Sequence, residues 1–228
     1  MGGLNGAFTL LDGNMDLAGN YLYNGSNKYV TEDSRLTNYL DDGSSLITEN
    51  NGYSTTRTDG HRFGVRLEHK FSENTSILFE PRVNFGRGNY VEYSDYDINK
   101  DLGDGTEQTL TNKGTTRNTG DNKNWTTEGF LLFRQKLGKP GRTISLHTRY
   151  SFSGNELDGL NQSLTQTYGT SPVTDFVNQR IDRTSNSYSV NSRLVYTEPL
   201  GKNFYIEANY SYGWNKNTSL KNAYDSGN

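Results

Sequence analysis

The sequence contains no cysteine, which excludes disulfide bonds and thiolate metal sites. It has no run of lysine and arginine, and its formal net charge is -3, so a strongly basic nucleic-acid binder is also excluded. No apolar run approaches the ~20 residues that a membrane-spanning helix needs. The first residues, MGGLNGAFTLLDG, lack the basic and then apolar pattern of a secretion signal, so we expect any exported form to be cut from a longer chain.

Hydrophobic residues are scarce, at 31% of 228 residues, and the mean hydropathy is -0.87. Disordered chains have similar values, but they are poor in aromatic residues, whereas this chain has 16 Tyr and 10 Phe. The length suits one large all-β domain or a sizeable part of one.

The clearest pattern is an alternation with a period of two between Arg62 and Tyr93. The apolar members are Phe63, Val65, Leu67 and Phe71 in the first arm, and Ile77, Phe79, Pro81, Val83 and Phe85 in the second. The residues between them are mostly charged or polar, and the short polar break 72–74 separates the two arms. Such a pattern predicts a β-hairpin whose strands have one apolar and one polar face.

The same rhythm occurs in four places along the chain. The predicted hairpins cover about 4–23, 58–93, 125–153 and 183–216, with short turns at 12–14, 72–74, 138–141 and 199–202. Long polar loops are predicted at about 24–57, 94–123 and 154–182. We therefore predict one unit, 1–228, of the all-β class. It is an antiparallel up-and-down meander of about eight strands, with short turns at one end and long loops at the other, forming a barrel or a barrel segment.

The alternation of short and long connections distinguishes between architectures. Compact domains favour loops of ~4–6 residues, whereas outer-membrane barrels combine short turns at one end with long loops at the other. Aromatic residues collect where the strands meet the long loops, as in the two interfacial girdles of such barrels, although tyrosine also favours strands in general. The set comprises Tyr21, Tyr23, Tyr90, Tyr93, Trp125, Tyr150, Phe152, Tyr188, Tyr212 and Trp214, with Phe71, Tyr196 and Phe204 at the short-turn ends.

A family resemblance is carried by residues 130–153, FLLFRQKLGKPGRTISLHTRYSFS. An apolar run is followed by Arg134 and Lys136, a short basic turn, Gly141-Arg142-Thr143 and an alternating strand. This stretch resembles outer-membrane β-barrel proteins of the TonB-dependent receptor type in Gram-negative bacteria. The match in strand rhythm extends over nearly the whole chain.

The resemblance implies a receptor or transporter in the cell outer membrane. Its implied partners are outer-membrane lipid, an N-terminal plug domain, TonB-type energy coupling in the parent chain, and an external ligand of unknown identity; nucleic acid is not among them. The chain shows neither a plug nor a signal peptide, and it does not finish with an aromatic-ended strand. We therefore expect an internal segment of the barrel, to which transport cannot be assigned alone.

Two other functions compete with the receptor barrel. A soluble periplasmic or surface-attached β-sheet binding module would bury its apolar faces in a common core made of Phe63, Val65, Phe79, Val83, Ile206 and Tyr210. An outer-membrane hydrolase would need a converging acid, base and nucleophile. The sequence contains no nucleophile elbow, P-loop or dinucleotide glycine pattern, so we do not predict an enzyme. We predict no catalytic, cofactor-binding or metal-binding residue, and no cofactor.

Two groups of residues have the composition of metal sites. One acidic stretch contains Asp95, Asp97, Asn99, Asp101, Asp104 and Glu107. A calcium loop would need glycine where Lys100 stands and a bidentate carboxylate where Thr106 stands, so we predict a solvated acidic loop. His61, His69 and His147 share no metal-ligand spacing, and we predict that each has a structural role, with His69 on the apolar side and His147 on the polar side.

The polar side of the strands carries charges of both signs. The charged residues are Arg66, Glu68, Glu80, Arg82, Glu128, Arg134, Arg149, Arg193 and Glu207. They fit a channel wall, but the mixture of signs favours pairing with one another, because selective pores tend to carry one sign. Pro81 lacks a backbone donor in the middle of a strand, which predicts a bulge or a local unpaired position.

Overall fold

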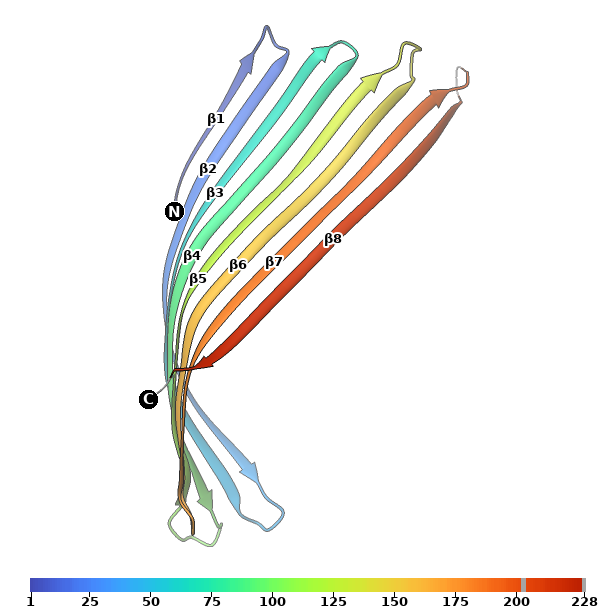
Figure 1. The fold of residues 1–228 in the computed structure, drawn as a ribbon. Coiled ribbons are helices and arrows are strands. Elements are labelled where there is room, and N and C mark those ends of the chain that lie inside the picture. Colours follow the sequence, from blue (N-terminus) through green and yellow to red (C-terminus); the bar gives the residue numbers. More distant parts are fainter. Residues whose placement is uncertain (202–203, 227–228) are drawn as a thin grey trace.

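In a computed structural model of the chain, eight strands form a single antiparallel sheet (Figure 1). The structure describes residues 1–201 and 204–226. The strands are β1 (Gly2–Leu10), β2 (Met15–Tyr39), β3 (Ser45–Ser72), β4 (Thr75–Asp101), β5 (Thr109–Lys136), β6 (Thr143–Thr167), β7 (Val173–Pro199) and β8 (Tyr205–Asp225). Each strand pairs with the next along the chain, which confirms the predicted all-β meander. In the described part of the chain, no helix is long and apolar enough to cross a membrane.

The short turns lie where the sequence predicts them. The β1–β2 turn contains Gly13, whose φ of 86° suits glycine. The amide of Asn14 closes this turn by donating to the carbonyl of Leu11 at 3.0 Å. Only residues 73 and 74 separate β3 from β4. In the predicted turn 199–202, Lys202 lies outside the described residues, as do the last two residues of the chain.

The predicted long loops are wrong for most of their length, because the strands continue through them. The polar segments 24–57, 94–123 and 154–182 belong to strands except at the turns 40–44, 102–108 and 168–172. Both faces of these extensions are polar, so apolar alternation gives no signal there. The backbone groups nevertheless pair with the neighbouring strands, as in the continuous β2–β3 ladder that ends at Tyr39 and Ser45.

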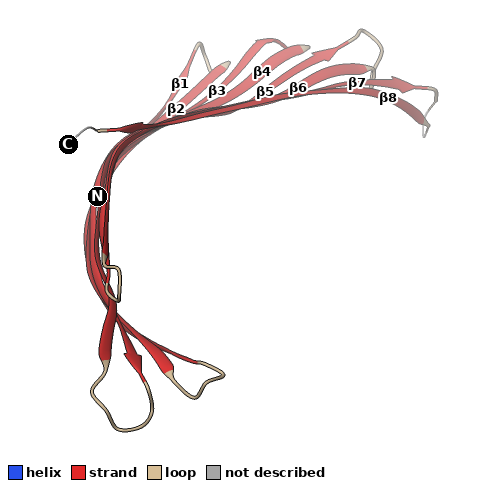
Figure 2. Cartoon of the chain, turned by 60° about the horizontal axis from the view of Figure 1, so that its bottom comes forward, coloured by secondary structure: helices blue, strands red, loops and turns tan. Residues whose placement is uncertain are grey.

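The sheet is one curved layer with two open edges (Figure 2). Within the described residues, each strand contacts only its neighbours in sequence, so β1 and β8 do not meet. Ile47 and Leu132 are the buried hydrophobic residues of the described chain. A sheet of this kind has no interior core, and its two faces must be covered by something else.

The prediction for Pro81 is confirmed. On the β3 side, the ladder pairs Gly64 with Arg82 and Leu67 with Phe79, and the two positions between them are unpaired. The register is the same on both sides of this gap, so the irregularity is an unpaired position and not a bulge. On the β5 side, Pro81 pairs with Gly129 in an unbroken ladder. The proline therefore directs its missing donor toward β3.

Candidate functional site

The strand register places most of the apolar residues of the eight strands on one side of the sheet, here called the apolar face. Leu67, for example, lies opposite Leu17 on β2 and Phe79 on β4, and Phe79 lies opposite Leu131 on β5. Directly opposite residues in antiparallel strands point to the same face. The face comprises Leu4, Phe8, Leu10, Met15, Leu17, Tyr21, Phe63, Val65, Leu67, Ile77, Phe79, Val83, Phe85, Leu131, Phe133, Ile144, Leu146, Tyr150, Val190, Leu194, Ile206, Tyr210 and Tyr212.

Large side chains on the apolar face are exposed to the surroundings. Phe63 is 42% exposed, Phe85 44% and Tyr210 70%. Val65, Val83 and Ile206 are exposed as well, and Phe79 is half-buried against its neighbours. The common core that a soluble module would form from these residues is therefore not present in the described chain.

A row of aromatic rings crosses the apolar face at its end farthest from the short turns. Tyr23 lies opposite His61, His61 opposite Phe85, and Phe85 opposite Trp125. The ring centroids of Tyr23 and His61 are 5.2 Å apart, and those of His61 and Phe85 are 5.0 Å apart. On β6 and β7, Phe152 contacts Tyr188 at 5.8 Å.

Two tyrosines expected in this row lie elsewhere. Both are farther along β4, beyond Phe85, because β4 continues where a loop was predicted. Tyr93 is on the same side as the apolar face and lies opposite Tyr53, whereas Tyr90 points to the other side, above Gly120.

Charged residues cover the same side of the sheet directly beyond the aromatic row. They are Arg57, Asp59, Arg87, Asp121, Lys123, Glu156, Asp158, Arg180 and Asp182. Arg180 pairs with Asp158 at 2.9 Å and with Asp182 at 3.3 Å. The apolar face therefore ends abruptly, first at rings and then at full charges.

The opposite side of the same strands, here called the polar face, carries the ion pairs that the sequence predicts. Arg66 bonds to Glu80 and lies 3.1 Å from Glu68. Across β4 and β5, Arg82 and Glu128 approach to 3.9 Å.

At the β8 edge of the polar face, Arg193 and Glu207 are 3.6 Å apart. Arg149 lies over the ring of Phe130, 5.5 Å from its centroid. Arg134 has no carboxylate within ion-pair distance in the described part of the chain. Mutual pairing is therefore confirmed for most of these charges, and it is incomplete on β5 and β6.

The three histidines each have a local hydrogen-bond partner, as predicted for structural histidines. His61 bonds to the hydroxyl of Tyr21 at 2.8 Å. His69 bonds to the carbonyl of Asn14 at 3.1 Å on the apolar side, and His147 bonds to Ser145 at 3.1 Å on the polar side.

The acidic stretch 95–107 covers the end of β4 and the turn that follows. Asp97 pairs with Lys113 at 3.5 Å. Asp104 accepts hydrogen bonds from the amide and hydroxyl of Thr106, and these bonds lower the pKa of its carboxyl. Among the described residues, no group of three His, Asp or Glu side chains is arranged to hold a metal ion.

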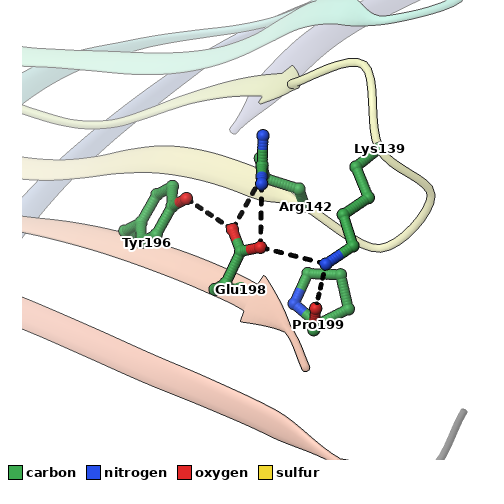
Figure 3. Close-up of polar contacts among 5 residues, drawn as sticks. All are labelled: Lys139, Arg142, Tyr196, Glu198 and Pro199. Atoms are coloured by element: carbon green, nitrogen blue, oxygen red, sulfur yellow. Dashed lines mark hydrogen bonds and ion pairs between the residues drawn. The ribbon is translucent and has the colours of Figure 1, made fainter. Parts of the chain in front are cut away.

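The sequence does not reveal the tightest polar cluster, which joins the β5–β6 turn to the end of β7 (Figure 3). Glu198 accepts two hydrogen bonds from Arg142, at 2.6 and 2.8 Å, and one from Tyr196 at 2.6 Å. Lys139 lies 3.2 Å from the same carboxylate and donates to the carbonyl of Pro199. The hydrogen bonds that Glu198 accepts from Arg142 and Tyr196 lower the pKa of its carboxyl to about 2.

On the apolar side of the sheet, two glycines lie under aromatic rings, and the sequence alone does not reveal these contacts. Tyr150 covers Gly129, and a Cβ built on that glycine would lie 2.5 Å from the ring. Trp125 covers Gly154 in the same way. In both cases the ring and the glycine are directly opposite in the ladder, so only the register identifies the pair.

Comparisons with known proteins add little to this description. No protein-family model matches the chain, and no curated protein matches it. A weakly similar solved structure is the crystal structure of the beta domain of the Bordetella autotransporter Brka, at 9% identity and a TM-score of 0.14. The alignment covers 87% of this chain and 97% of that chain. A likeness of this size carries no argument about fold or function, so the functional case depends on the two faces of the sheet.

Proposed function

We propose that this chain is a β-barrel segment of the cell outer membrane, in a transport or binding protein of the TonB-dependent receptor type. The observation that carries the proposal is the exposed apolar face, which is bounded by rings and then by charges. An exposed apolar surface of this extent is costly in water and favourable against lipid chains.

The dimensions of the apolar face support contact with a bilayer. On β4, the face extends over nine residues from Ile77 to Phe85, and a tilted membrane-spanning strand needs ~9–11 residues. Tilted barrel strands present an apolar band ~25 Å tall, with aromatic girdles at its borders. Tyr196 and the exposed Phe204 form the border near the short turns.

The polar face supports the proposed role in transport or binding, because it would form the wall of a lumen that conducts or binds a polar solute. In membrane barrels, lumen-facing residues alternate with lipid-facing ones and are polar. Here the ion pairs of Arg66 and Arg82 lie on the face opposite the apolar band. The open edges at β1 and β8 would be joined by further strands of a larger barrel, because an unpaired edge exposes backbone donors and acceptors.

The proposal assigns partners to three parts of the molecule. Lipid covers the apolar face, a plug domain of the parent chain occupies the lumen, and TonB-type coupling supplies energy. An external ligand reaches the polar face from the long end of the strands. The chain has no catalytic role in this proposal.

A soluble periplasmic or surface-attached binding module is the alternative. Its strongest requirement is burial of the six apolar residues named for its core, and five of them are exposed. A second layer supplied by another chain would be needed to cover them.

Surface labelling of intact cells tests the proposal. One epitope tag is inserted in the β4–β5 turn, 102–108, and a matched tag in the β5–β6 turn, 138–141, at the opposite end of the same strand. We expect the first tag to react with antibody on intact cells and the second to react only after the outer membrane is opened. A 102–108 tag that needs permeabilised cells would move the protein to the periplasm and favour the soluble module.

The transport assignment needs its own measurement. Cells that lack the energy-coupling protein should lose uptake of the ligand while they keep the tagged barrel at the surface. Uptake that is unchanged in such cells would leave a passive barrel and contradict the receptor type.

A further inference from the structure

The polar face of β5–β8 has a surplus of positive charge at one place. His147 lies directly opposite Arg193, and Arg149 is the next residue of β6 on the same side. Arg134 lies opposite Ser145, which precedes His147 by two residues on the same face of β6. Glu207 lies 3.6 Å from Arg193, and both side chains are more than half exposed.

This arrangement leaves the guanidinium groups short of partners. The other carboxylates near Phe130 have cations of their own: Glu80 bonds to Arg66, and Glu128 lies 3.9 Å from Arg82. Arg149 and Arg193 are diagonal neighbours on adjacent strands, because Arg149 lies opposite Asn191, and their like charges repel unless an anion lies between them. An exposed ion pair such as that of Arg193 contributes little and can be replaced by a better acceptor.

Arg149 and Arg193, but not Arg134, line a hollow in the sheet surface. The hollow has a volume of about 750 Å³, and its walls include Phe130, His147, Arg149, Arg193 and Glu207. Phe130 lies beneath Arg149 and holds the guanidinium over its ring. A planar guanidinium fixed in this way keeps its N–H groups free for an oxyanion, and arginine binds carboxylate or phosphate with two parallel hydrogen bonds.

We propose that this hollow, centred on Arg149 and Arg193, binds the carboxylate or phosphate group of a small anionic ligand. The inference rests on the proposed function, because it takes the polar face as the wall that the ligand meets. It specifies the class of ligand: a solute with at least one oxyanion group.

Titration calorimetry with the chain in a nonionic detergent tests the site, with inorganic pyrophosphate and citrate as probes. We expect saturable binding of at least one probe. Arg149→Gln and Arg193→Gln should each weaken it about five- to tenfold, since each removes charge-assisted hydrogen bonds. Glu207→Gln should strengthen binding, because it frees Arg193 from its competing carboxylate. Binding of pyrophosphate alone would indicate a preference for phosphate, and binding of citrate alone a preference for carboxylate. Binding of both probes would indicate a general oxyanion site.

The matched control is Arg180→Gln, which removes one cation from the other side of the sheet and should leave binding unchanged. Absence of saturable binding by both probes would overturn the inference, and so would equal weakening by Arg180→Gln. Glu207→Gln is expected to strengthen binding, which a variant that merely unfolds could not do. The surface-labelling experiment is independent of this titration. If the 102–108 tag is labelled on intact cells but no probe binds, only the ligand site is contradicted. If a probe binds but the tag is not labelled on intact cells, the outer-membrane function is contradicted.

Discussion

The contacts of single residues on the apolar side of the sheet depend more on the strand register than on the residue type. Gly129 and Gly154 are ordinary strand glycines in the sequence, yet each lies under an aromatic ring from a neighbouring strand. Glu198 looks like one acidic residue among many, yet its partner Arg142 lies 56 positions away in the chain. Such contacts depend on which residues become opposite, and periodicity alone does not supply that information.

Gly129→Ala should destabilise the folded chain. The new methyl group would lie 2.5 Å from the Tyr150 ring and displace it, and overpacking of this kind costs about 1–3 kcal/mol. The matched control is Gly19→Ala on the same face, where the nearest atom is the carbonyl oxygen of Gly64 at 3.8 Å. The control should be neutral or stabilising by about 0.5–1 kcal/mol. Urea unfolding from lipid vesicles measures both, and equal effects would show that the ring contact is unimportant.

Glu198→Gln should remove a stabilisation that depends on pH. Hydrogen bonds from Arg142 and Tyr196 hold the pKa of Glu198 at about 2, below its ordinary value of 4.5. A lowered folded-state pKa means that the stabilisation is complete above pH 4.5 and is lost as the pH falls toward 2. The unfolding midpoints of the wild type and Glu198→Gln should therefore differ most at neutral pH and converge near pH 2.

The control for Glu198 is Glu49→Gln, which removes a carboxylate from a single exposed pair with Arg35 at 3.5 Å. A pair of that kind contributes little, so this variant should behave as the wild type at every pH. A difference between Glu198→Gln and the wild type that stays constant down to pH 2 would contradict the assigned role of the carboxylate.

At the scale of the strands, the sequence predicts the number, order and facing of the elements but not their length. Alternation identifies each strand wherever one side is apolar, as between Phe63 and Phe85. The alternation stops where both sides of a strand are polar. The sequence therefore predicts loops at 24–57, 94–123 and 154–182, although the strands continue there with the same backbone ladder. The polar-face pairs of Arg66 and Arg82 were predictable because alternating strands put their partners on one side.

Pro81→Val tests the gap in the middle of the β3–β4 ladder. Valine restores a backbone donor toward Val65, and a new hydrogen bond contributes about 0.5–1.5 kcal/mol. Hydrogen exchange at Val65 should become slower, and the unfolding midpoint should rise. Pro172→Val, in the turn before β7, is the control and should leave exchange at this amide unchanged. Unchanged exchange in Pro81→Val would show that the gap has another cause.

At the scale of the whole molecule, the two tryptophans report on what covers the apolar face. Trp125 and Trp214 are 41% and 43% exposed on that face. In lipid vesicles, bromine carried by lipid chains should quench both strongly, whereas iodide in the water should quench them weakly. The single-tryptophan variants Trp125→Phe and Trp214→Phe separate the two signals.

A tryptophan on the polar face provides the control for this measurement. Phe130→Trp, in a chain that lacks both natural tryptophans, places the ring on the polar face of the same strand. Its fluorescence should respond to iodide and not to brominated lipid. Strong iodide quenching of Trp125 and Trp214 would contradict a lipid-covered apolar face.

The continuous ladders beyond the charged rows have a mechanical consequence. A loop swings by rotation about a few backbone bonds, whereas a strand inside a ladder can swing only if its hydrogen bonds to both neighbours break together. On β4 this stiff region extends from Arg87 to Ile98, where the register with β5 shifts. In the proposed barrel, this part of the wall would therefore be a fixed rim and not a set of movable loops. The width of the entrance would be constant, and a gate would have to be a separate body that enters or leaves it.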